Sequence, residues 1–130
     1  MARKKIGEYT VVGNANVWPH ELRTADALKN AGHNVKFIPA SNREDEHTAD
    51  CYVDGVRWEM KAPDGASLAV VERNLRRGLR QANKIVFDSR RVKKIPDKAI
   101  QRELSSQLKH ITELEQIMFV NRHGEVIDIE

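Results

Sequence analysis

The chain has 130 residues, 40% of them apolar and 32% charged, which is typical of a soluble globular protein with an ordinary core. No apolar run approaches the roughly 18 residues of a membrane span, and no apolar segment follows the basic N-terminal residues, so neither a membrane protein nor a secretory signal is expected. The single cysteine, Cys51, excludes an internal disulfide and gives no support to a structural zinc site. We expect a polar N-terminal segment over residues 1–18 and one domain over 19–130.

Positive charge is concentrated in one part of the chain. Between residues 67 and 94, nine basic residues accompany only two acids, whereas the rest of the chain has thirteen basic and seventeen acidic residues. This asymmetry predicts a localised surface that binds a polyanion, and it excludes an evenly basic protein.

The first predicted elements are a short edge strand at residues 9–12, a helix and a strand. The helix begins at Pro19, which suits a first turn, and Gly32 ends it. The next strand covers residues 33–39 and ends at a proline.

A β-hairpin is the strongest local prediction. Two runs rich in β-branched and aromatic residues flank Asp54 and Gly55, a pair that favours a type I′ turn. This turn sets the register of the two strands. The predicted opposite pairs are Val53 with Val56, Tyr52 with Arg57, Cys51 with Trp58, and Asp50 with Glu59. Cys51 is therefore expected on the buried side, as a small apolar residue.

The other side of the hairpin gathers Asp50, Glu59 and Lys61, because side chains alternate along a strand. Directly opposed carboxylates repel each other, so a compensating charge is expected. Lys61 can offset one of them, and a divalent cation held by Asp50 and Glu59 can offset both. Mg²⁺ suits such a pair, with Mn²⁺ or Zn²⁺ as alternatives, and its chemistry with Lys61 would be phosphodiester hydrolysis. The competing interpretation is a solvated polar face on an edge strand.

A basic helix is expected after the hairpin, from Ser67 to about Asn83. Apolar residues at helical spacing are predicted to face the core, namely Leu68, Val71, Leu75, Leu79 and Ala82. Four arginines recur on another side without an interleaved acid, namely Arg73, Arg76, Arg77 and Arg80. Together with Arg90 and Arg91 in the following basic loop, they are candidates for binding phosphate groups.

The remaining elements complete a mixed sheet. A compact strand is expected at residues 84–88, a helix from Pro96, and a closing hairpin from strands at 115–120 and 125–129. The order of elements gives an α/β (α+β) fold with an αβββαβ core, a mixed central sheet flanked by helices, and a C-terminal hairpin.

The spacing Asp50…Glu59-Met60-Lys61 and this order of elements resemble the PD-(D/E)XK, restriction-endonuclease-like nucleases. The resemblance implies that the acids and the lysine are catalytic, and that a glutamate on the preceding helix joins them, here Glu21. An ordinary first-turn role for Glu21, favoured by the helix dipole, remains the alternative. The chain departs from the motif at Ala49, where the family has proline.

A wider pattern resembles the C-terminal tRNase domain of CdiA-type contact-dependent growth-inhibition toxins. The residues that carry it are Glu21…Ala25…Leu28…Gly32-His-Asn-Val35, Asp50-Cys-Tyr-Val-Asp-Gly55…Trp58-Glu-Met-Lys-Ala-Pro63 and Arg80-Gln-Ala-Asn-Lys-Ile-Val-Phe-Asp88. The resemblance implies cleavage of RNA, with tRNA favoured, a cognate immunity protein as partner, and action in the cytoplasm, after delivery from another cell if the protein is a toxin. It also places Gln81 near phosphate or a metal-bound water. The long delivery region of these toxins is not expected within these 130 residues.

Two further possibilities stay open at this stage. Some toxins of this kind are barnase-like and need no metal, in which case Lys61, His47 and the arginines would be catalytic and the acid pair structural. The protein is otherwise a non-catalytic module that binds nucleic acid, DNA or RNA, without a membrane partner.

Overall fold

The computed structural model of the protein describes residues 6–40 and 49–130. Its elements in chain order are β1 (Tyr9–Val11), α1 (Pro19–Asn30), β2 (Val35–Ile38), β3 (Asp50–Val53), β4 (Val56–Lys61), α2 (Ala69–Gly78), β5 (Lys84–Asp88), α3 (Asp97–His110), β6 (Gln116–Val120) and β7 (Val126–Asp128). Hydrogen-bonded neighbours run from β1 to β7 in this order, with parallel and antiparallel pairs. The predicted mixed fold, its αβββαβ core and its closing hairpin are confirmed.

The chain divides into two compact units, one up to Trp58 and one from Glu59. The boundary falls inside β4, whose first half pairs with β3 and whose second half pairs with β5.

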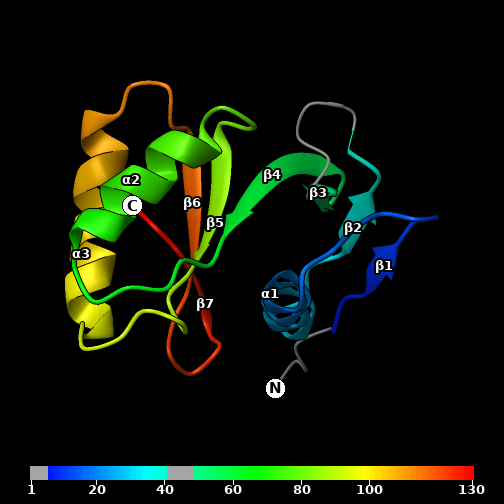
Figure 1. The fold of residues 1–130 in the computed structure, drawn as a ribbon, viewed down its shortest axis with the longest axis horizontal. Coiled ribbons are helices and arrows are strands. Elements are labelled where there is room, and N and C mark those ends of the chain that lie inside the picture. Colours follow the sequence, from blue (N-terminus) through cyan, green and yellow to red (C-terminus); the bar gives the residue numbers. More distant parts are fainter. Residues whose placement is uncertain (1–5, 41–48) are drawn as a thin grey trace, which may run out of the picture. The chain divides into compact units, whose positions relative to one another are not determined.

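In the first unit, helix α1 contacts β1 and β2 (Figure 1). One face of this small sheet is buried and includes Val35, Phe37 and Cys51. The intervening residues Lys36 and Tyr52 point to the opposite, more exposed face, as alternation along a strand requires. The burial of Cys51 is as predicted.

The β3–β4 hairpin has the predicted turn and three of the four predicted cross-strand pairs, but the predicted pair of Asp50 with Glu59 is not among those observed. Asp54 and Gly55 have φ angles of 52° and 82°, and positive values at both central positions define a type I′ turn. The observed pairs are Cys51 with Trp58, Tyr52 with Arg57, and Val53 with Val56.

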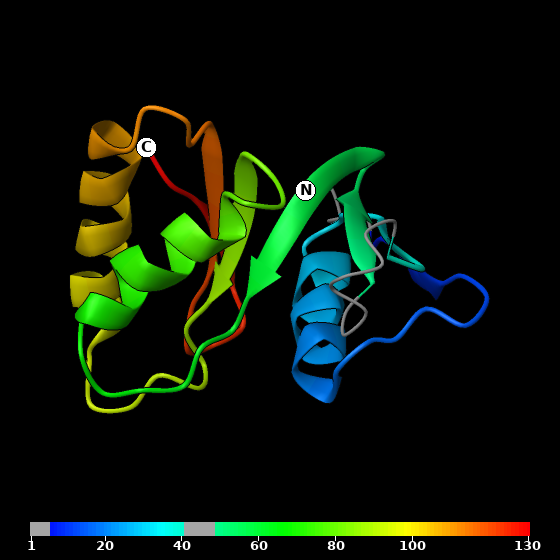
Figure 2. The same cartoon turned by 45° about the horizontal axis from the view of Figure 1, so that its top comes forward.

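In the second unit, α2 and α3 lie side by side on one face of β5 and β6 (Figures 1 and 2). The core between these helices and the strands contains Leu75, Phe87, Leu104 and Phe119, all fully buried. Strands β4, β5 and β6 are parallel, and β7 closes the sheet in the antiparallel direction.

Helix α2 differs from its prediction at both ends. It stops at Gly78, not near Asn83, and the chain continues in turns such as the hydrogen bond from Gln81 N to the Gly78 carbonyl. The glycine, a poor helix former, lies at this end, and the chain must turn here to enter β5. Leu68 precedes the helix and is 39% exposed, so its predicted core position was wrong and Val70 is buried instead.

No helix within the described residues is both long and apolar enough to span a bilayer.

Candidate active site

The polar residues of β4 lie on one side of the strand. Arg57, Glu59 and Lys61 are half-buried, whereas Trp58 and Met60 between them are buried. This alternation is the predicted one, and the half-buried positions are Arg57 in the first unit and Glu59 and Lys61 in the second.

In the first unit, Asp50 is held by Arg57. The Arg57 Nη2 atom lies 3.2 Å from Asp50 Oδ1, and the Asp50 side chain is only 14% exposed. Arg57 also donates a hydrogen bond to the Trp58 carbonyl. Arg57 is not among the residues predicted to form the site, although the predicted register puts it diagonally across from Asp50.

In the second unit, Glu59 and Lys61 form a close pair along the strand. Lys61 Nζ lies 3.5 Å from Glu59 Oε2, and the two side chains are 24% and 15% exposed. Helix α2 approaches closely here, because a Cβ atom on Gly78 would lie 3.5 Å from Glu59 Cγ and 2.8 Å from Ile85 Cδ1. The glycine therefore lets the end of α2 lie beside the Glu59 side chain.

Glu21 caps its own helix. Its carboxylate accepts a hydrogen bond of 2.9 Å from the Trp18 backbone N–H, the contact that a glutamate in the first turn makes in one half of a capping box. This contact gives Glu21 a structural role and leaves its predicted catalytic role a proposal. His47, the candidate of the metal-free interpretation, lies outside the described residues.

The predicted metal ligands are Asp50 and Glu59. Within residues 6–40 and 49–130, no group of three or more histidine, cysteine, aspartate or glutamate side chains is placed to hold an ion. Carboxylates are the ligands that Mg²⁺ commonly takes from proteins, so the chemistry of each residue suits this ion, but Asp50 lies in the first unit and Glu59 in the second.

The arginines of α2 are exposed, but they are not all without a partner. Arg76 forms an ion pair of 2.9 Å with Glu72, one turn earlier, which corrects the expectation that no acid accompanies this group. Arg73 and Arg77 remain exposed on the helix, whereas Arg80 lies beyond its end because the helix stops at Gly78.

The predicted basic loop after β5 is used partly for structure. Arg90 binds Asp88, 4% exposed, through two parallel bonds, at 2.8 Å between Nη2 and Oδ2 and 3.0 Å between Nε and Oδ1. Arg91 donates a bond of 2.7 Å to the Ala62 carbonyl, just after β4. Gln81 is exposed after α2. Both arginines therefore have protein partners, which leaves them less available to a phosphate.

The turn of the hairpin carries a clear pKa shift. Partial burial raises the pKa of Asp54, but the hydrogen bond from the Asn34 backbone N–H and the hydrogen bond and charge of His33 outweigh it. The net result is a pKa below the ordinary value of 3.8. His33 Nδ1 lies 2.7 Å from Asp54 Oδ2, so this pair ties the turn to the chain just before β2.

Comparison with known proteins points to one family. The family model described as the contact-dependent growth inhibition CdiA C-terminal domain matches residues 46–126. The solved structure described as the CdiA-CT/CdiI toxin and immunity complex from Burkholderia pseudomallei is similar in fold, with a TM-score of 0.70, 17% identity, and coverage of 95% of this chain and 99% of that one. No curated protein matches.

Proposed function

The chain belongs to the contact-dependent growth inhibition CdiA C-terminal domain family, and we propose that it is a toxin nuclease that hydrolyses phosphodiester bonds of RNA, with tRNA as the favoured substrate. One observation carries the proposal. In the second unit, strand β4 holds Glu59 and Lys61 as a half-buried pair, with Lys61 Nζ 3.5 Å from Glu59 Oε2. A carboxylate and an amine held together in this way are groups that phosphodiester hydrolysis uses.

In the proposed mechanism Asp50 and Glu59 would hold a divalent metal ion, Mg²⁺, Mn²⁺ or Zn²⁺. When bound, such an ion polarises a phosphoryl oxygen and makes water a stronger nucleophile. Lys61 stabilises the negative charge that develops on the phosphate, because it is a fixed cation in a half-buried position. Glu21 would join these residues only if its carboxylate left the cap of α1.

The substrate backbone would be held by the exposed arginines of α2 and of the turn that follows it. Arg73, Arg77 and Arg80 have planar forks that match phosphate oxygens, and Arg76 could exchange Glu72 for a phosphate. Gln81 and the basic loop with Arg90 and Arg91 would contribute at the edge of this surface. The partners that follow are RNA and, by analogy with the toxin and immunity complex of similar fold, a cognate immunity protein. The family name implies delivery between cells, with action in the recipient cytoplasm.

A metal-free ribonuclease is the second candidate. It is favoured by the ion pairs themselves, since Asp50 and Glu59 each already have a cationic partner and need no metal for charge balance. In that case Lys61 and the arginines would carry out acid–base chemistry, and the two carboxylates would be structural.

Cleavage of a tRNA pool and of duplex DNA, each with Mg²⁺ and with EDTA, separates the candidates. The metal-dependent nuclease cleaves tRNA only with Mg²⁺, the metal-free ribonuclease cleaves it in both conditions, and a mere binder cleaves nothing. Glu59→Gln should lower cleavage about 1,000-fold in the metal-dependent case, because it weakens the hold on the ion that stabilises developing charge, and losing one charge-stabilising group typically costs about 10²- to 10³-fold. Glu103→Gln is the matched control, because this half-buried carboxylate on α3 is bonded only to Gln107 among the described side chains. Full activity of Glu59→Gln would overturn the metal-dependent proposal.

The role of α2 in RNA binding can be tested with two variants that lose the same net charge. Arg73, Arg76 and Arg77 are changed together to glutamine, and the comparison variant changes Lys98, Arg102 and Lys109, exposed cations on α3. Both variants lose the same charge, so a specific role of α2 predicts weaker RNA binding in the first alone. The slope of log K against log salt should fall by about 0.7–0.9 for each phosphate that the variant no longer neutralises. Equal effects of the two variants would show that only net charge matters.

A further inference from the structure

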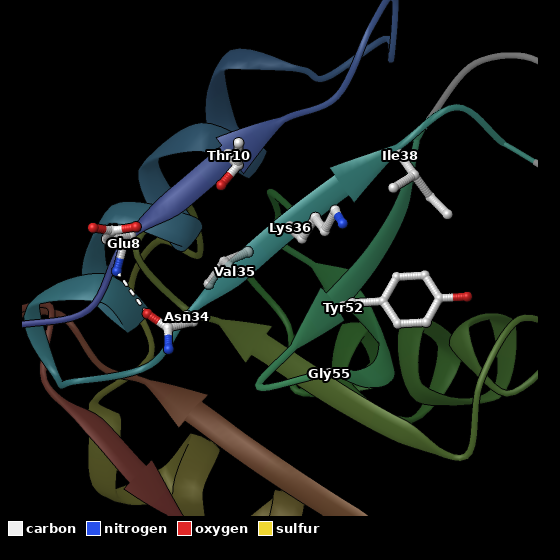
Figure 3. Close-up of a pocket in the computed structure, with 8 residues that line it drawn as sticks. All are labelled: Glu8, Thr10, Asn34, Val35, Lys36, Ile38, Tyr52 and Gly55. Atoms are coloured by element: carbon white, nitrogen blue, oxygen red, sulfur yellow. Dashed lines mark hydrogen bonds between the residues drawn. The ribbon is translucent and has the colours of Figure 1, made fainter.

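A pocket opens on the exposed face of the first unit's sheet. Its volume is about 440 Å³, which lies within the range of about 300–1,000 Å³ typical of small-molecule sites. Thr10 of β1, Lys36 and Ile38 of β2, and Tyr52 of β3 line it, and Figure 3 shows these side chains around it. The pocket therefore lies across three adjacent strands.

Four side chains form a row across this face. The strand register pairs Thr10 with Lys36, Lys36 with Tyr52, and Tyr52 with Arg57. Paired residues point to the same side of a sheet, so the aromatic ring of Tyr52 lies between two cationic side chains. The Tyr52 ring is half-exposed and Lys36 is exposed, and neither side chain has a hydrogen bond or ion pair within residues 6–40 and 49–130.

We propose that this row binds an unpaired nucleotide of the RNA substrate, with the base stacked on Tyr52 and a phosphate on Lys36. The inference rests on the proposed function and deepens it, because it names the form of RNA that the site accepts. Aromatic side chains stack on any base through its π-face, and RNA-binding proteins read unpaired loops in this way because their bases can leave the stack. A base inside a duplex is already stacked on its neighbours and cannot use the ring.

The row adjoins the proposed catalytic carboxylate. Ile38 of the pocket pairs with Asp50, which is two residues from Tyr52 on the same face and therefore about 7 Å along the strand. A nucleotide on Tyr52 would thus place a neighbouring phosphate close to Asp50. Glu8, the acid that also lines the pocket, lies two residues before Thr10, on the strand next to Lys36. Figure 3 shows the Lys36 amine on the side of Ile38 and Tyr52, away from Glu8, so a phosphate on Lys36 would lie on that side.

The pocket also offers a donor to the edge of a base. Asn34 lies just before β2, and its Oδ1 accepts a hydrogen bond of 3.1 Å from the Glu8 backbone N–H. This bond fixes the amide, and Figure 3 shows its nitrogen turned away from Glu8. The amide N–H groups can therefore donate to a carbonyl or ring nitrogen of the base.

Fluorescence of 2-aminopurine in a short single-stranded RNA tests the proposal, because stacking on an aromatic ring quenches this base. The protein carries Glu59→Gln to prevent cleavage. Tyr52→Leu should weaken binding about 10-fold and abolish the quenching, as expected for the loss of one base–aromatic stack. Tyr52→Phe should retain both, because it keeps the ring. Tyr9→Leu is the matched control, since Tyr9 is also exposed on this sheet but pairs with Val35 on the opposite face.

The outcomes are decisive when thermal melting shows that each variant is folded. Unchanged binding and quenching in Tyr52→Leu would overturn the inference, as would tighter binding of the duplex than of the single strand. Tighter binding of single-stranded DNA of the same sequence would overturn the assignment to RNA.

A parallel cleavage assay, without Glu59→Gln, keeps the two proposals distinct. If the unsubstituted protein cleaves tRNA and Tyr52→Leu cleaves it equally fast, this inference fails and the nuclease proposal stands. If nothing is cleaved but quenching still depends on Tyr52, the nuclease proposal fails and the binding site stands.

Discussion

The two halves of strand β4 pair in different ways, and each carries its own ion pair. Residues 56–58 pair with β3 across a two-residue turn, whereas residues 59–61 pair with β5, which follows helix α2. In the first half Arg57 binds Asp50 and a backbone carbonyl, so the guanidinium is held in place. In the second half Lys61 has one ion pair among the described residues, at 3.5 Å to Glu59. The difference suggests that Arg57 positions its carboxylate, while Lys61 remains available to a substrate.

The largest effect on cleavage is expected from replacing Lys61, the cation in the second half of β4. Lys61→Met should lower kcat about 1,000-fold with little loss of stability, because removing a group that stabilises developing charge costs about 10²- to 10³-fold. The side chain is half-buried at the end of β4, and methionine retains its apolar stem. Single-turnover cleavage of tRNA and thermal melting measure the two quantities.

The matching change in the first half should behave differently. Arg57→Met removes the guanidinium that lies 3.2 Å from the half-buried Asp50 carboxylate, which should cost about 1–3 kcal/mol of unfolding free energy, and kcat should fall by no more than about 100-fold through misplacement of Asp50. Lys84→Met is a control for both, because Lys84 is a half-buried lysine at the start of β5, bonded to Gln116. If Arg57→Met abolished cleavage and Lys61→Met did not, the assignment of roles would be reversed.

The same contrast explains what the sequence could and could not predict. The hairpin half was predictable to the residue, because Asp54-Gly55 fixes a turn and the turn fixes the register of Cys51 with Trp58. Helix α2 separates β4 from β5 in the sequence, and the pairing of the two strands depends on how this helix packs. No local sequence pattern therefore specifies their register. Arg73 and Arg90 look alike in sequence but differ in structure, because Arg90 binds the buried carboxylate of Asp88. The burial of that carboxylate is not visible in any periodic sequence pattern.

The close approach of α2 at Gly78 likewise depends on contacts between residues that are distant in sequence. Its absent side chain lets α2 lie beside Ile85 and Glu59, and the sequence showed only a glycine in an amphipathic helix. The short α2, and with it the location of Arg80, therefore could not be predicted from periodicity alone.

A smaller effect is expected where α2 approaches the second half of β4. In Gly78→Ala the new methyl group would lie 2.8 Å from Ile85 Cδ1, and Ile85 is fully buried, so the unfolding free energy should fall by about 1 kcal/mol despite the better helix propensity of alanine. Ile85→Val removes the clashing methyl group and alone should cost about 1 kcal/mol. The double variant should therefore be more stable than the sum of the two losses predicts. Urea denaturation measures all three variants, and strict additivity would show that the close approach is relieved elsewhere.

The smallest effect on stability is expected at the Asp54-Gly55 turn, which joins β3 to the first half of β4. Asp54→Asn keeps a residue that tolerates positive φ and an oxygen for the Asn34 N–H, but it removes the charge that faces His33. Both side chains are open to solvent, so the loss at neutral pH should be about 0.5 kcal/mol or less.

The pH dependence of this loss has a definite sign. The pKa of Asp54 is lowered in the folded state, so the ionised carboxylate stabilises the protein above the ordinary value of 3.8, and this contribution disappears as the pH falls through the lower, folded-state pKa. The unfolding curves of the unsubstituted protein and Asp54→Asn should therefore differ at pH 6 and converge on acidification below about pH 4. Asp26→Asn on α1 removes a charge from the same unit without touching the turn. A difference that grew on acidification would show that the His33 contact does not hold the Asp54 carboxylate in its charged form.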